Sequence, residues 1–442
     1  MQRNLDALDG VFDVLVVGGG IYGACIARLA AQSGWSVALL ERGDFGGAVS
    51  HNSLKIVHGG LRYVQHFDFP RIWESVAAQR AWLRAAGHLV RPLRCVVPTY
   101  GYGLRGPLAF ALGLFTFHAT AGRRNKDIGV SSRLPRSGLL SRRALLSQYP
   151  ELDRRGLTGG AYWYDAQMLD ANRLTFECIK DACNWGTVIA NHVDVLQLRV
   201  TQSQVDGVVA RDCLTGREFD VRARVTVNAT GPFIERLLST SPADLSFVQP
   251  LVWTRNVNVV TRRIFSTEDA IGVGSHRASD AALGRSKRLF FITPWQDCSI
   301  IGTSHIMHEG DPEDLSAAVR ADVDRFLQEV NDALPRLRLE KGDLCYVHSG
   351  LTPAEDEVQR SKRSSIIDHA SVHGVRGLLS VIGIKYTTAP VVAGRVMSEI
   401  ARSLGESPAK PADFSSVLPG NVGSSSCDMP LPDKATESHD AR

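Results

Sequence analysis

Residues 12–41, FDVLVVGGGIYGACIARLAAQSGWSVALLE, constrain the fold more than any other part of this chain. Their hydrophobic pattern predicts a buried strand, a glycine turn, a helix and a second strand that ends on an acid. Gly18 allows the tight turn, Gly20 lets a pyrophosphate approach the backbone, and Gly23 lets the helix pack closely on the strand. Glu41 follows about 20 residues later, where a carboxylate binds ribose hydroxyls. The segment therefore predicts a nucleotide-binding βαβ unit, with the N-terminus of the helix facing the phosphates.

Gly101, Gly103 and Gly106 repeat this glycine spacing in a different context. Pro98 interrupts the apolar run before them, and proline is disfavoured in a central strand. The position at which an acid would bind the ribose holds Arg124. We therefore expect only the first match to bind a nucleotide.

The composition is that of a large globular protein. The 442 residues are 44% hydrophobic, which is enough for one large core or two and suggests roughly two to three domains. A formal net charge of +4 is small for this length and gives no reason to expect a nucleic-acid partner. The eight cysteines include no CxxC pair, so we interpret them as reduced residues and expect neither disulfides nor a metal site.

The longest apolar stretch, residues 107–117, is about half the ~20 residues that a membrane-spanning helix needs. One interpretation is a buried helix of a substrate domain. The other is a helix on a membrane surface, assisted by Arg105, Arg123, Arg124 and Lys126. The first ten residues are polar with two acids, which is not typical of a signal peptide. We expect a cytoplasmic protein, with peripheral contact at the inner face of the membrane as an open alternative.

Several further segments suit a ligand site. Residues 42–64, RGDFGGAVSHNSLKIVHGGLRYV, are too polar for a core strand, and a loop of this length beside a nucleotide is usually functional. Strand 225–227 ends at small residues that permit close approach by a phosphate or adenosine. Amphipathic patterns predict helices at 170–185 and 315–334, and alternating patterns predict antiparallel strands between 247 and 302.

Seven segments together resemble the FAD-dependent glycerol-3-phosphate dehydrogenases, within the wider D-amino-acid-oxidase-like flavoproteins. They are VVGGGIYGACIA, LLERGDF, SLKIVHGGLRYV, VNATGPF, FFITPW, SIIGTSH and IGIKYTT. The similarity covers residues 12–405, and HGGLRY at 58–63 with its spacing to IGIKYTT makes it specific. It implies an α/β fold, with a Rossmann-like FAD-binding domain of the D-amino-acid-oxidase type and a discontinuous antiparallel-sheet substrate domain.

The resemblance also implies a division of the chain. The FAD-binding domain would contain residues 1–90, 150–240 and 345–404. The substrate domain would contain 91–149 and 241–344. Residues 405–442 are rich in Pro, Ser, Gly and Asp, and we expect a disordered tail there.

A noncovalent FAD is the expected cofactor, with its pyrophosphate over the first glycine turn, its ribose on Glu41 and its adenine at the backbone of Val193. The residues expected to bind it are Gly18, Gly20, Ile21, Tyr22, Gly23, Glu41, Arg42, Ser50, Ser53, Lys55, His58, Gly59, Val193, Ala229, Thr230, Gly231, Gly350, Gly383, Ile384, Lys385, Tyr386 and Thr387.

In such enzymes a hydride leaves the alcohol carbon for flavin N5 while a base removes the hydroxyl proton. Arg62, Tyr63 and Lys385 match the family's substrate-side residues, and a cation there would stabilise alkoxide charge or hold an anionic substrate. With Asn256 and Thr352, which occupy two further family positions, they are the candidate catalytic residues.

Three departures from the family bear on the substrate. Thr352 in SGLTP replaces an arginine that grips the substrate phosphate, and Asn256 replaces a histidine that is the likeliest proton acceptor. The turn before Lys385 reads GIK rather than GGK, which adds the Ile384 side chain near the flavin. The family's helical C-terminal domain begins after a VLPG segment, whereas VLPG at 417–420 precedes a short polar tail.

We therefore expect an FAD-dependent dehydrogenase or oxidase that converts a secondary alcohol to a ketone. The substrate would be a small polyol, hydroxy acid or sugar derivative, phosphorylated or not, and glycerol 3-phosphate itself would be a poor one. An amine or imino-acid oxidase and a flavin-binding partner protein without turnover stay open. The electron acceptor, whether oxygen, a quinone or a carrier, is open, as is a homodimer.

Overall fold

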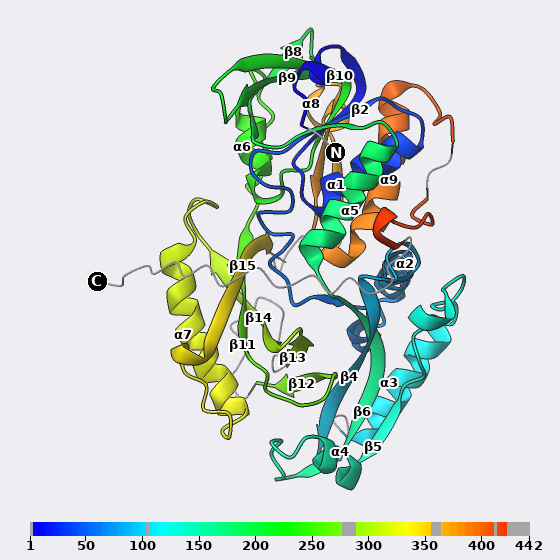
Figure 1. Ribbon diagram of the computed structural model, residues 1–442, viewed down its shortest axis with the longest axis vertical. Coiled ribbons are helices and arrows are strands. Elements are labelled where there is room, and N and C mark those ends of the chain that lie inside the picture. Colours follow the sequence, from blue (N-terminus) through cyan, green and yellow to red (C-terminus); the bar gives the residue numbers. More distant parts are fainter. Residues whose placement is uncertain (1–2, 103–105, 276–288, 355–363, 411–412, 422–442) are drawn as a thin grey trace.

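The structure is a computed structural model that describes residues 3–102, 106–275, 289–354, 364–410 and 413–421. Two sheets form its two halves, and the first sheet with its helices lies above the second in Figure 1. The helices are α1 (Ile21–Gln32), α2 (Phe69–Ala85), α3 (Pro107–Thr120), α4 (Arg142–Gln148), α5 (Ala171–Asn184), α6 (Ile234–Ser239), α7 (Ser316–Ala333), α8 (His369–His373) and α9 (Ala389–Leu404).

The first sheet is parallel at its centre. Its strands are β1 (Val11–Val17), β2 (Val37–Leu40), β7 (Val188–Ala190), β8 (Val193–Thr201), β9 (Gln204–Asp212), β10 (Glu218–Asn228), β16 (Ser365–Asp368) and β17 (Leu378–Ile382). In the order β17-β10-β1-β2-β7 all neighbours are parallel, and β16 and the β8–β9 hairpin add antiparallel strands. The carboxyl ends of β1, β2 and β10 meet at one edge, where open α/β sheets bind ligands.

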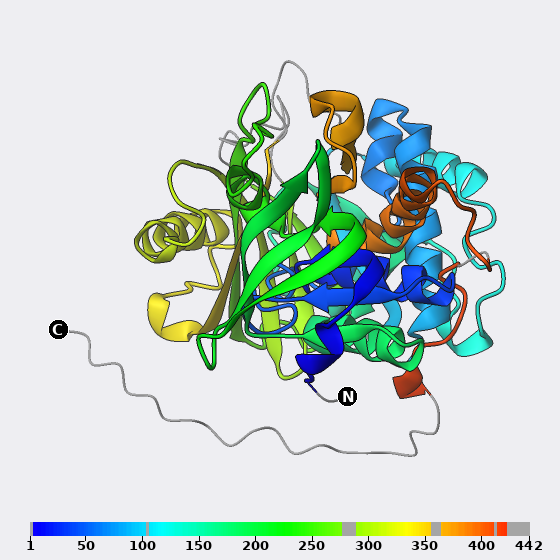
Figure 2. The ribbon, with the colours of Figure 1, turned by 90° about the horizontal axis from the view of Figure 1, so that it is seen from above.

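Different elements cover the two faces of this sheet, as Figure 2 shows from above. Val14 and Val16 of β1 pack in a buried cluster with residues of α1, α2, α5 and α9. Leu15 and Val17 point to the other face and pack with residues of β8 and β9. This period of two buries both faces of β1, as expected for a central parallel strand.

The second sheet is almost entirely antiparallel. Its strands are β3 (Ile56–Val57), β4 (Val90–Tyr100), β5 (Gly138–Ser141), β6 (Leu157–Met168), β11 (Trp253–Arg262), β12 (Ala270–Gly274), β13 (Leu289–Trp295), β14 (Cys298–His308) and β15 (Leu344–Pro353). The parallel exception is the short pairing of β12 with β4. Side chains of α7, including Phe326, pack against this sheet in a separate buried cluster.

The expected domain ranges differ from the sheets at three strands. Residues 1–90, 150–240 and 345–404 were assigned to the FAD-binding domain, but β3, β6 and β15 within them belong to the second sheet. β6 pairs along β4, and β15 pairs along β11. These pairings are long-range, so no local sequence pattern marks the crossing from one half to the other.

The apolar segment 107–117 forms the first part of α3, and the expectation of a buried helix there is wrong. Leu108 is 85% exposed and Phe115 is 72% exposed, whereas Leu114 and Phe117 are buried. Arg105 lies outside the described residues. In the described part of the chain, no helix combines the length and the apolar character that crossing a membrane requires.

The second glycine match lies in a different setting from the first. Gly101 follows β4, a strand of the second sheet, and Gly106 precedes α3. Gly103 lies outside the described residues. The next strand after α3 is β5, which pairs with β6 and not with β4, so this segment is not the turn of a βαβ unit between neighbouring parallel strands.

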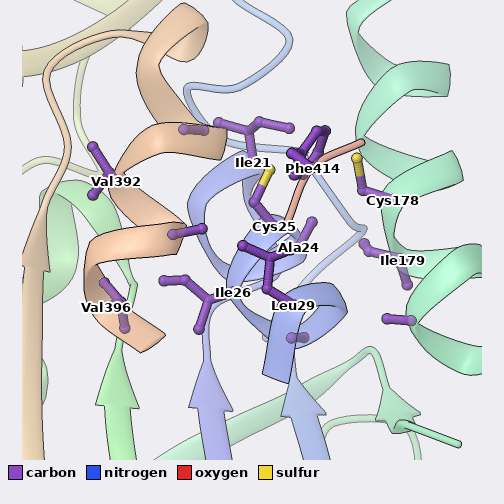
Figure 3. Packing of buried hydrophobic residues seen from close by; sticks show 14 of the residues in the cluster. Ile21, Ala24, Cys25, Ile26, Leu29, Cys178, Ile179, Val392, Val396 and Phe414 are labelled. Atoms are coloured by element: carbon purple, nitrogen blue, oxygen red, sulfur yellow. The ribbon is translucent and has the colours of Figure 1, made fainter. Parts of the chain in front are cut away.

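The prediction that residues 405–442 form a disordered tail is wrong for residues 413–421. Phe414 packs beside α1 and α5, as Figure 3 shows, and Leu418 is fully buried. The Arg28 guanidinium lies 4.3 Å from the centroid of the Phe414 ring and donates to the carbonyl oxygen of Ser416 at 2.9 Å. Two apolar side chains in a polar segment thus attach it to the core. Residues 411–412 and 422–442 lie outside the described residues.

We predict that Leu418→Ala lowers the free energy of unfolding by about 2–5 kcal/mol, because it leaves a cavity in the core. The neighbouring Val417 is 49% exposed, so Val417→Ala should change stability by no more than about 0.5 kcal/mol. Urea titration of both variants, followed by tryptophan fluorescence, measures the difference. Equal losses in the two variants would show that this segment does not pack on the core.

Candidate active site

One large cavity lies between the two sheets. Its volume is about 1960 Å³, beyond the roughly 300–1,000 Å³ that is typical of a pocket for one small molecule. It therefore has room for a dinucleotide and a second ligand. The expected site residues that line it are Gly18, Gly20, Ile21, Tyr22, Glu41, Arg42, Ser50, Ser53, His58, Arg62, Tyr63, Val193, Ala229, Thr230, Gly231, Asn256, Gly350, Thr352, Gly383, Ile384, Lys385, Tyr386 and Thr387.

The glycine turn between β1 and α1 leaves no room for side chains. Gly18 has a φ of +104°, and a Cβ there would lie 2.7 Å from the carbonyl oxygen of Ala229. A Cβ on Gly23 would lie 1.9 Å from the carbonyl oxygen of Gly18. Gly23 is therefore behind the cavity wall, where it permits the helix to pack on the turn. Gly20 is the N-cap of α1 and faces the cavity.

Glu41 stands beside this turn at the end of β2. Its Oε2 accepts a hydrogen bond from the Gly19 N–H at 2.7 Å, and its Oε1 accepts one from the Gly43 N–H at 2.8 Å. Both oxygens retain acceptor capacity for ribose hydroxyls. The Val193 N–H donates to the Glu41 carbonyl at 2.9 Å, and Val193 lines the cavity, so the expected backbone contact with adenine stays a prediction.

Two further residues near the turn have partners within the protein. The Ser50 hydroxyl oxygen accepts a hydrogen bond at 2.9 Å from the Ile21 N–H, in the first turn of α1. The Arg42 guanidinium pairs with Glu313 at 2.5 Å and lies 4.8 Å from the centroid of the Phe233 ring.

The structure places Lys55 and Gly59 behind the cavity wall, in contrast to the sequence expectation. The Lys55 ammonium donates to the His51 carbonyl oxygen and lies 5.4 Å from the centroid of the Trp295 ring. Burial lowers the pKa of Lys55 to about 8. The Gly59 N–H donates to Asp165 at 2.7 Å.

His58 faces the cavity and is oriented by Asp165. Its Nδ1 lies 3.0 Å from Asp165 Oδ2, which also accepts a hydrogen bond from the Trp163 indole N–H at 3.1 Å. Burial alone would raise the pKa of Asp165. The hydrogen bonds from His58, Gly59 and Trp163, with the charge on His58, outweigh burial and hold the pKa of this carboxyl below its ordinary value.

Lys385 and Tyr63 bring two distant segments together. The Lys385 ammonium donates to the Tyr63 hydroxyl, and the Arg71 guanidinium lies 4.3 Å from the centroid of the Tyr63 ring. Arg71 is itself paired with Asp68 at 2.5 Å. Lys385 is open to the cavity, and the protein atoms that surround it reduce its hydration. Loss of hydration, with a smaller contribution from Arg62, therefore lowers the pKa of Lys385 to about 8.

The turn that carries Lys385 is fixed from two sides. The Tyr22 hydroxyl donates to the Lys385 carbonyl at 2.7 Å, and the Trp82 indole N–H donates to the Thr387 carbonyl at 3.0 Å. A Cβ on Gly383 would lie 2.2 Å from the Tyr22 ring, so this turn needs glycine there. Tyr386 packs its ring on Trp82, with ring centroids 5.8 Å apart.

Asn256 and Thr352, predicted from separate segments, meet on the second sheet. The Asn256 amide donates from Nδ2 to Thr352 Oγ1 at 2.7 Å. The Asn256 Oδ1 is bonded to Nδ1 of His305, which lines the same cavity. We call His305, Asn256 and Thr352 the polar triad. Sequence reasoning recognised the SIIGTSH strand but missed its histidine, although the alternation of that strand could have placed His305 on the cavity face.

The described residues hold no cluster of three or more His, Cys, Asp or Glu side chains that could bind a metal ion.

Comparisons with known proteins agree with this geometry. The family model for FAD dependent oxidoreductases matches residues 13–400. A glycerol-3-phosphate dehydrogenase from Mycobacterium leprae is 33% identical over 385 residues, which are 86% of this chain and 62% of that protein. One from Synechocystis is 27% identical over 438 residues, which are 95% of this chain and 75% of that protein.

The crystal structure of the glycerol-3-phosphate dehydrogenase from Bacillus halodurans, complexed with FAD, has a TM-score of 0.69 and 24% identity. It covers 93% of this chain and 68% of that one. The chain spans between 51% and 75% of the length of these and other curated relatives. Because the family match runs through both sheets and the glycine turn, the chain belongs to the family of FAD dependent oxidoreductases.

Proposed function

We propose that this protein oxidises a secondary alcohol that carries an anionic group to a ketone and transfers a hydride to FAD. Its family supports the redox chemistry. The names of the relatives, glycerol-3-phosphate dehydrogenases, support an alcohol with a phosphate as the substrate class. The cavity supports both by combining a nucleotide turn with cations from other segments.

The residues that line the cavity around the glycine turn fit FAD. Gly18 and Gly20 leave the backbone open to a pyrophosphate at the N-terminus of α1, and Glu41 is placed for the ribose. The Ser50 hydroxyl oxygen accepts the hydrogen bond from the Ile21 N–H, a donor that could otherwise bind a phosphate oxygen. When bound there without a covalent link, FAD supplies the hydride acceptor.

The observation that carries the substrate class is a pair of cations, Arg62 and Lys385, that have no carboxylate partner in the described part of the chain. Arg62 and Lys385 both line the cavity, and Arg62 contributes to the lowered pKa of Lys385. Among the described residues, no Asp or Glu oxygen lies within ion-pair distance of either side chain. Two neighbouring positive charges repel each other, so an anion between them would be stabilised by both.

The neutral side chains at Asn256 and Thr352 argue against a tight phosphate clamp. An arginine at position 352 would bind a phosphate through two charged hydrogen bonds, whereas the Thr352 hydroxyl is uncharged and already bonded to Asn256. We therefore propose a substrate whose anionic group is held mainly by Arg62 and Lys385, such as a hydroxy acid or a phosphorylated polyol.

A finer part of the proposal is peripheral contact of the enzyme with a membrane. The exposed apolar side chains of α3, Leu108, Leu112 and Phe115, would suit peripheral contact with a membrane. Its neighbours Phe110 and Leu114 line the cavity, so the same helix connects the cavity with this surface.

We predict that Gly20→Val yields folded but colourless protein. Gly20 has a φ of −73°, which valine can adopt, and a Cβ there would lie 3.1 Å from Ser50 Oγ, so the Ser50 side chain must shift by a few tenths of an ångström. The side chain would occupy the pyrophosphate position. Gly394→Val, on an exposed site of α9 with open space around it, is the control and should stay yellow. Stoichiometric FAD in Gly20→Val would contradict the proposal that the pyrophosphate binds at Gly20.

A substrate panel tests the proposed reaction. Glycerol, glycerol 3-phosphate, lactate, glycerate and glycine are each mixed with the flavoprotein without oxygen, and bleaching of the flavin is followed. We expect an anionic secondary alcohol to bleach it fastest. Glycerol 3-phosphate should be roughly ten- to a hundredfold weaker than the best of them, because one charged hydrogen-bonding partner is lost. Bleaching by glycine alone indicates an amine oxidase, and no bleaching indicates a binding protein.

We predict that Lys385→Met lowers kcat about a hundredfold or more, with normal FAD content. The Lys385 ammonium is present below its pKa of about 8 and is lost as pH rises through that value. The wild-type kcat should therefore fall above pH 8, and this decline should be missing in the variant. Lys341→Met, on an exposed side chain, is the control. A rise in KM with kcat unchanged would show that the lysine only anchors the substrate.

A further inference from the structure

Three charged side chains from distant segments meet at the wall of the cavity. Arg42 lies two residues after the end of β2, Arg236 lies on α6, and Glu313 lies between β14 and α7. The two arginines belong to the half of the molecule that contains the first sheet, whereas Glu313 belongs to the half that contains the second sheet. In Figure 1 the segment before α7 lies at the upper end of that helix, on the side of α6. We call these three side chains the ionic bridge.

Both arginines of the ionic bridge bind the same carboxylate oxygen. Nη1 of Arg42 and Nη1 of Arg236 each donate to Oε1 of Glu313 at 2.5 Å. The Arg42 guanidinium also lies 4.8 Å from the centroid of the ring of Phe233, the residue before α6. Hydrogen bonds between a guanidinium and a carboxylate are charge-assisted, and they are stronger than bonds between neutral groups. Glu313 thus connects one segment of the second half with two segments of the first.

The ionic bridge borders the part of the cavity where we expect the adenosine of FAD. Glu41, the carboxylate expected at the ribose, is the residue directly before Arg42. Val193, expected at the adenine, lines the same cavity and donates its N–H to the Glu41 carbonyl. Phe233 lines the cavity as well, two residues after Gly231 of the expected FAD site. The contacts between the two halves at this place therefore lie beside the adenosine.

The carboxylate of Glu313 is ionised at neutral pH. The hydrogen bond and the charge of Arg42, with a smaller contribution from Arg236, hold the pKa of Glu313 below its ordinary value. Two guanidinium groups that share one oxygen would repel each other without the negative charge between them. Loss of that charge would therefore do more than remove two hydrogen bonds, because it would leave two like charges side by side where the halves meet.

The ionic bridge is also partly exposed to solvent. The exposed fractions are 40% for Arg42, 47% for Glu313 and 55% for Arg236. Ion pairs with this exposure contribute little each, and dissolved salt weakens them further. Such a contact can delay the separation of the two halves, but it cannot prevent it. This strength suits a closure that has to open when a cofactor enters or leaves.

We propose that the ionic bridge closes the adenosine end of the cavity over bound FAD and slows the release of the cofactor. The inference rests on the FAD site of the proposed function and concerns the retention of FAD, which is separate from the reaction of the substrate. Release requires that Glu313 separates from both arginines, so that the segment before α7 can move away from α6. Glu313 is thus a positioning residue that acts through Arg42 and Arg236.

The first experiment measures FAD release from the FAD-loaded protein carrying Glu313→Gln. The protein is strongly diluted at low salt, and the fluorescence of free FAD is followed. We expect release about two- to tenfold faster than from wild type. Asp324→Asn is the matched control, because Asp324 is 45% exposed, is paired with Lys341 at 2.8 Å and is not among the described residues that line the cavity. It should keep the wild-type rate.

Three other results have a clear meaning. An unchanged rate in Glu313→Gln overturns the proposal, while FAD binding and the proposed function stand. Slower release also overturns it, because it would show that Arg42 and Arg236 bind FAD better once Glu313 no longer holds them. If purified wild type binds no FAD at all, the FAD site of the proposed function fails, and this inference fails with it.

The second experiment tests whether the effect comes from the charges. In about 1 M NaCl the difference in release rate between wild type and Glu313→Gln should become small, because salt screens the ion pairs. Arg236→Glu should speed release, and combining it with Glu313→Arg should bring the rate back toward that of wild type, since the exchanged charges can pair again. A difference that salt does not reduce, or no recovery in the double variant, would overturn the proposal.

Discussion

The close approach of three backbone segments at Gly18 determines where the other parts of the site can be. A Cβ on Gly18 would lie 2.7 Å from the carbonyl oxygen of Ala229, and a Cβ on Gly23 would lie 1.9 Å from the carbonyl oxygen of Gly18. Only hydrogen atoms fit at these contacts, so α1 begins at the edge where β1 and β10 end. The Gly19 N–H then meets Glu41, and the N-terminus of α1 opens into the cavity.

Tyr22 extends this constraint to the part of the cavity where Lys385 lies. Tyr22 lies in the first turn of α1, and its hydroxyl bonds the carbonyl of Lys385, which is more than 300 residues away in sequence. The glycine turn and the turn that carries Lys385 are thus joined by one side chain. The absence of a Cβ at Gly383 makes this contact possible, because a Cβ there would lie 2.2 Å from the Tyr22 ring.

The sequence predicted the parts of the site that depend on local patterns. The glycine spacing, Glu41 and the turn before Lys385 are each contained in a short segment, and each lines the cavity or supports its wall. Features that depend on pairing between distant segments were missed. β4 continues through Pro98 because β12 pairs only with residues 95–96 of this strand. Phe414 and Leu418 pack on a core formed by helices that are distant in sequence. The bond between Asn256 and His305 depends on strand register, which no single segment encodes.

Two of the departures from the family can be understood as one change. By the resemblance, Thr352 stands where the family has an arginine and Asn256 stands where it has a histidine, and these two side chains are hydrogen-bonded to each other. A neutral amide beside a hydroxyl can orient a third group, and β14 presents His305 to it. In the proposed function, Arg62 and Lys385 on the opposite wall are then the cations that hold the anionic part of the substrate.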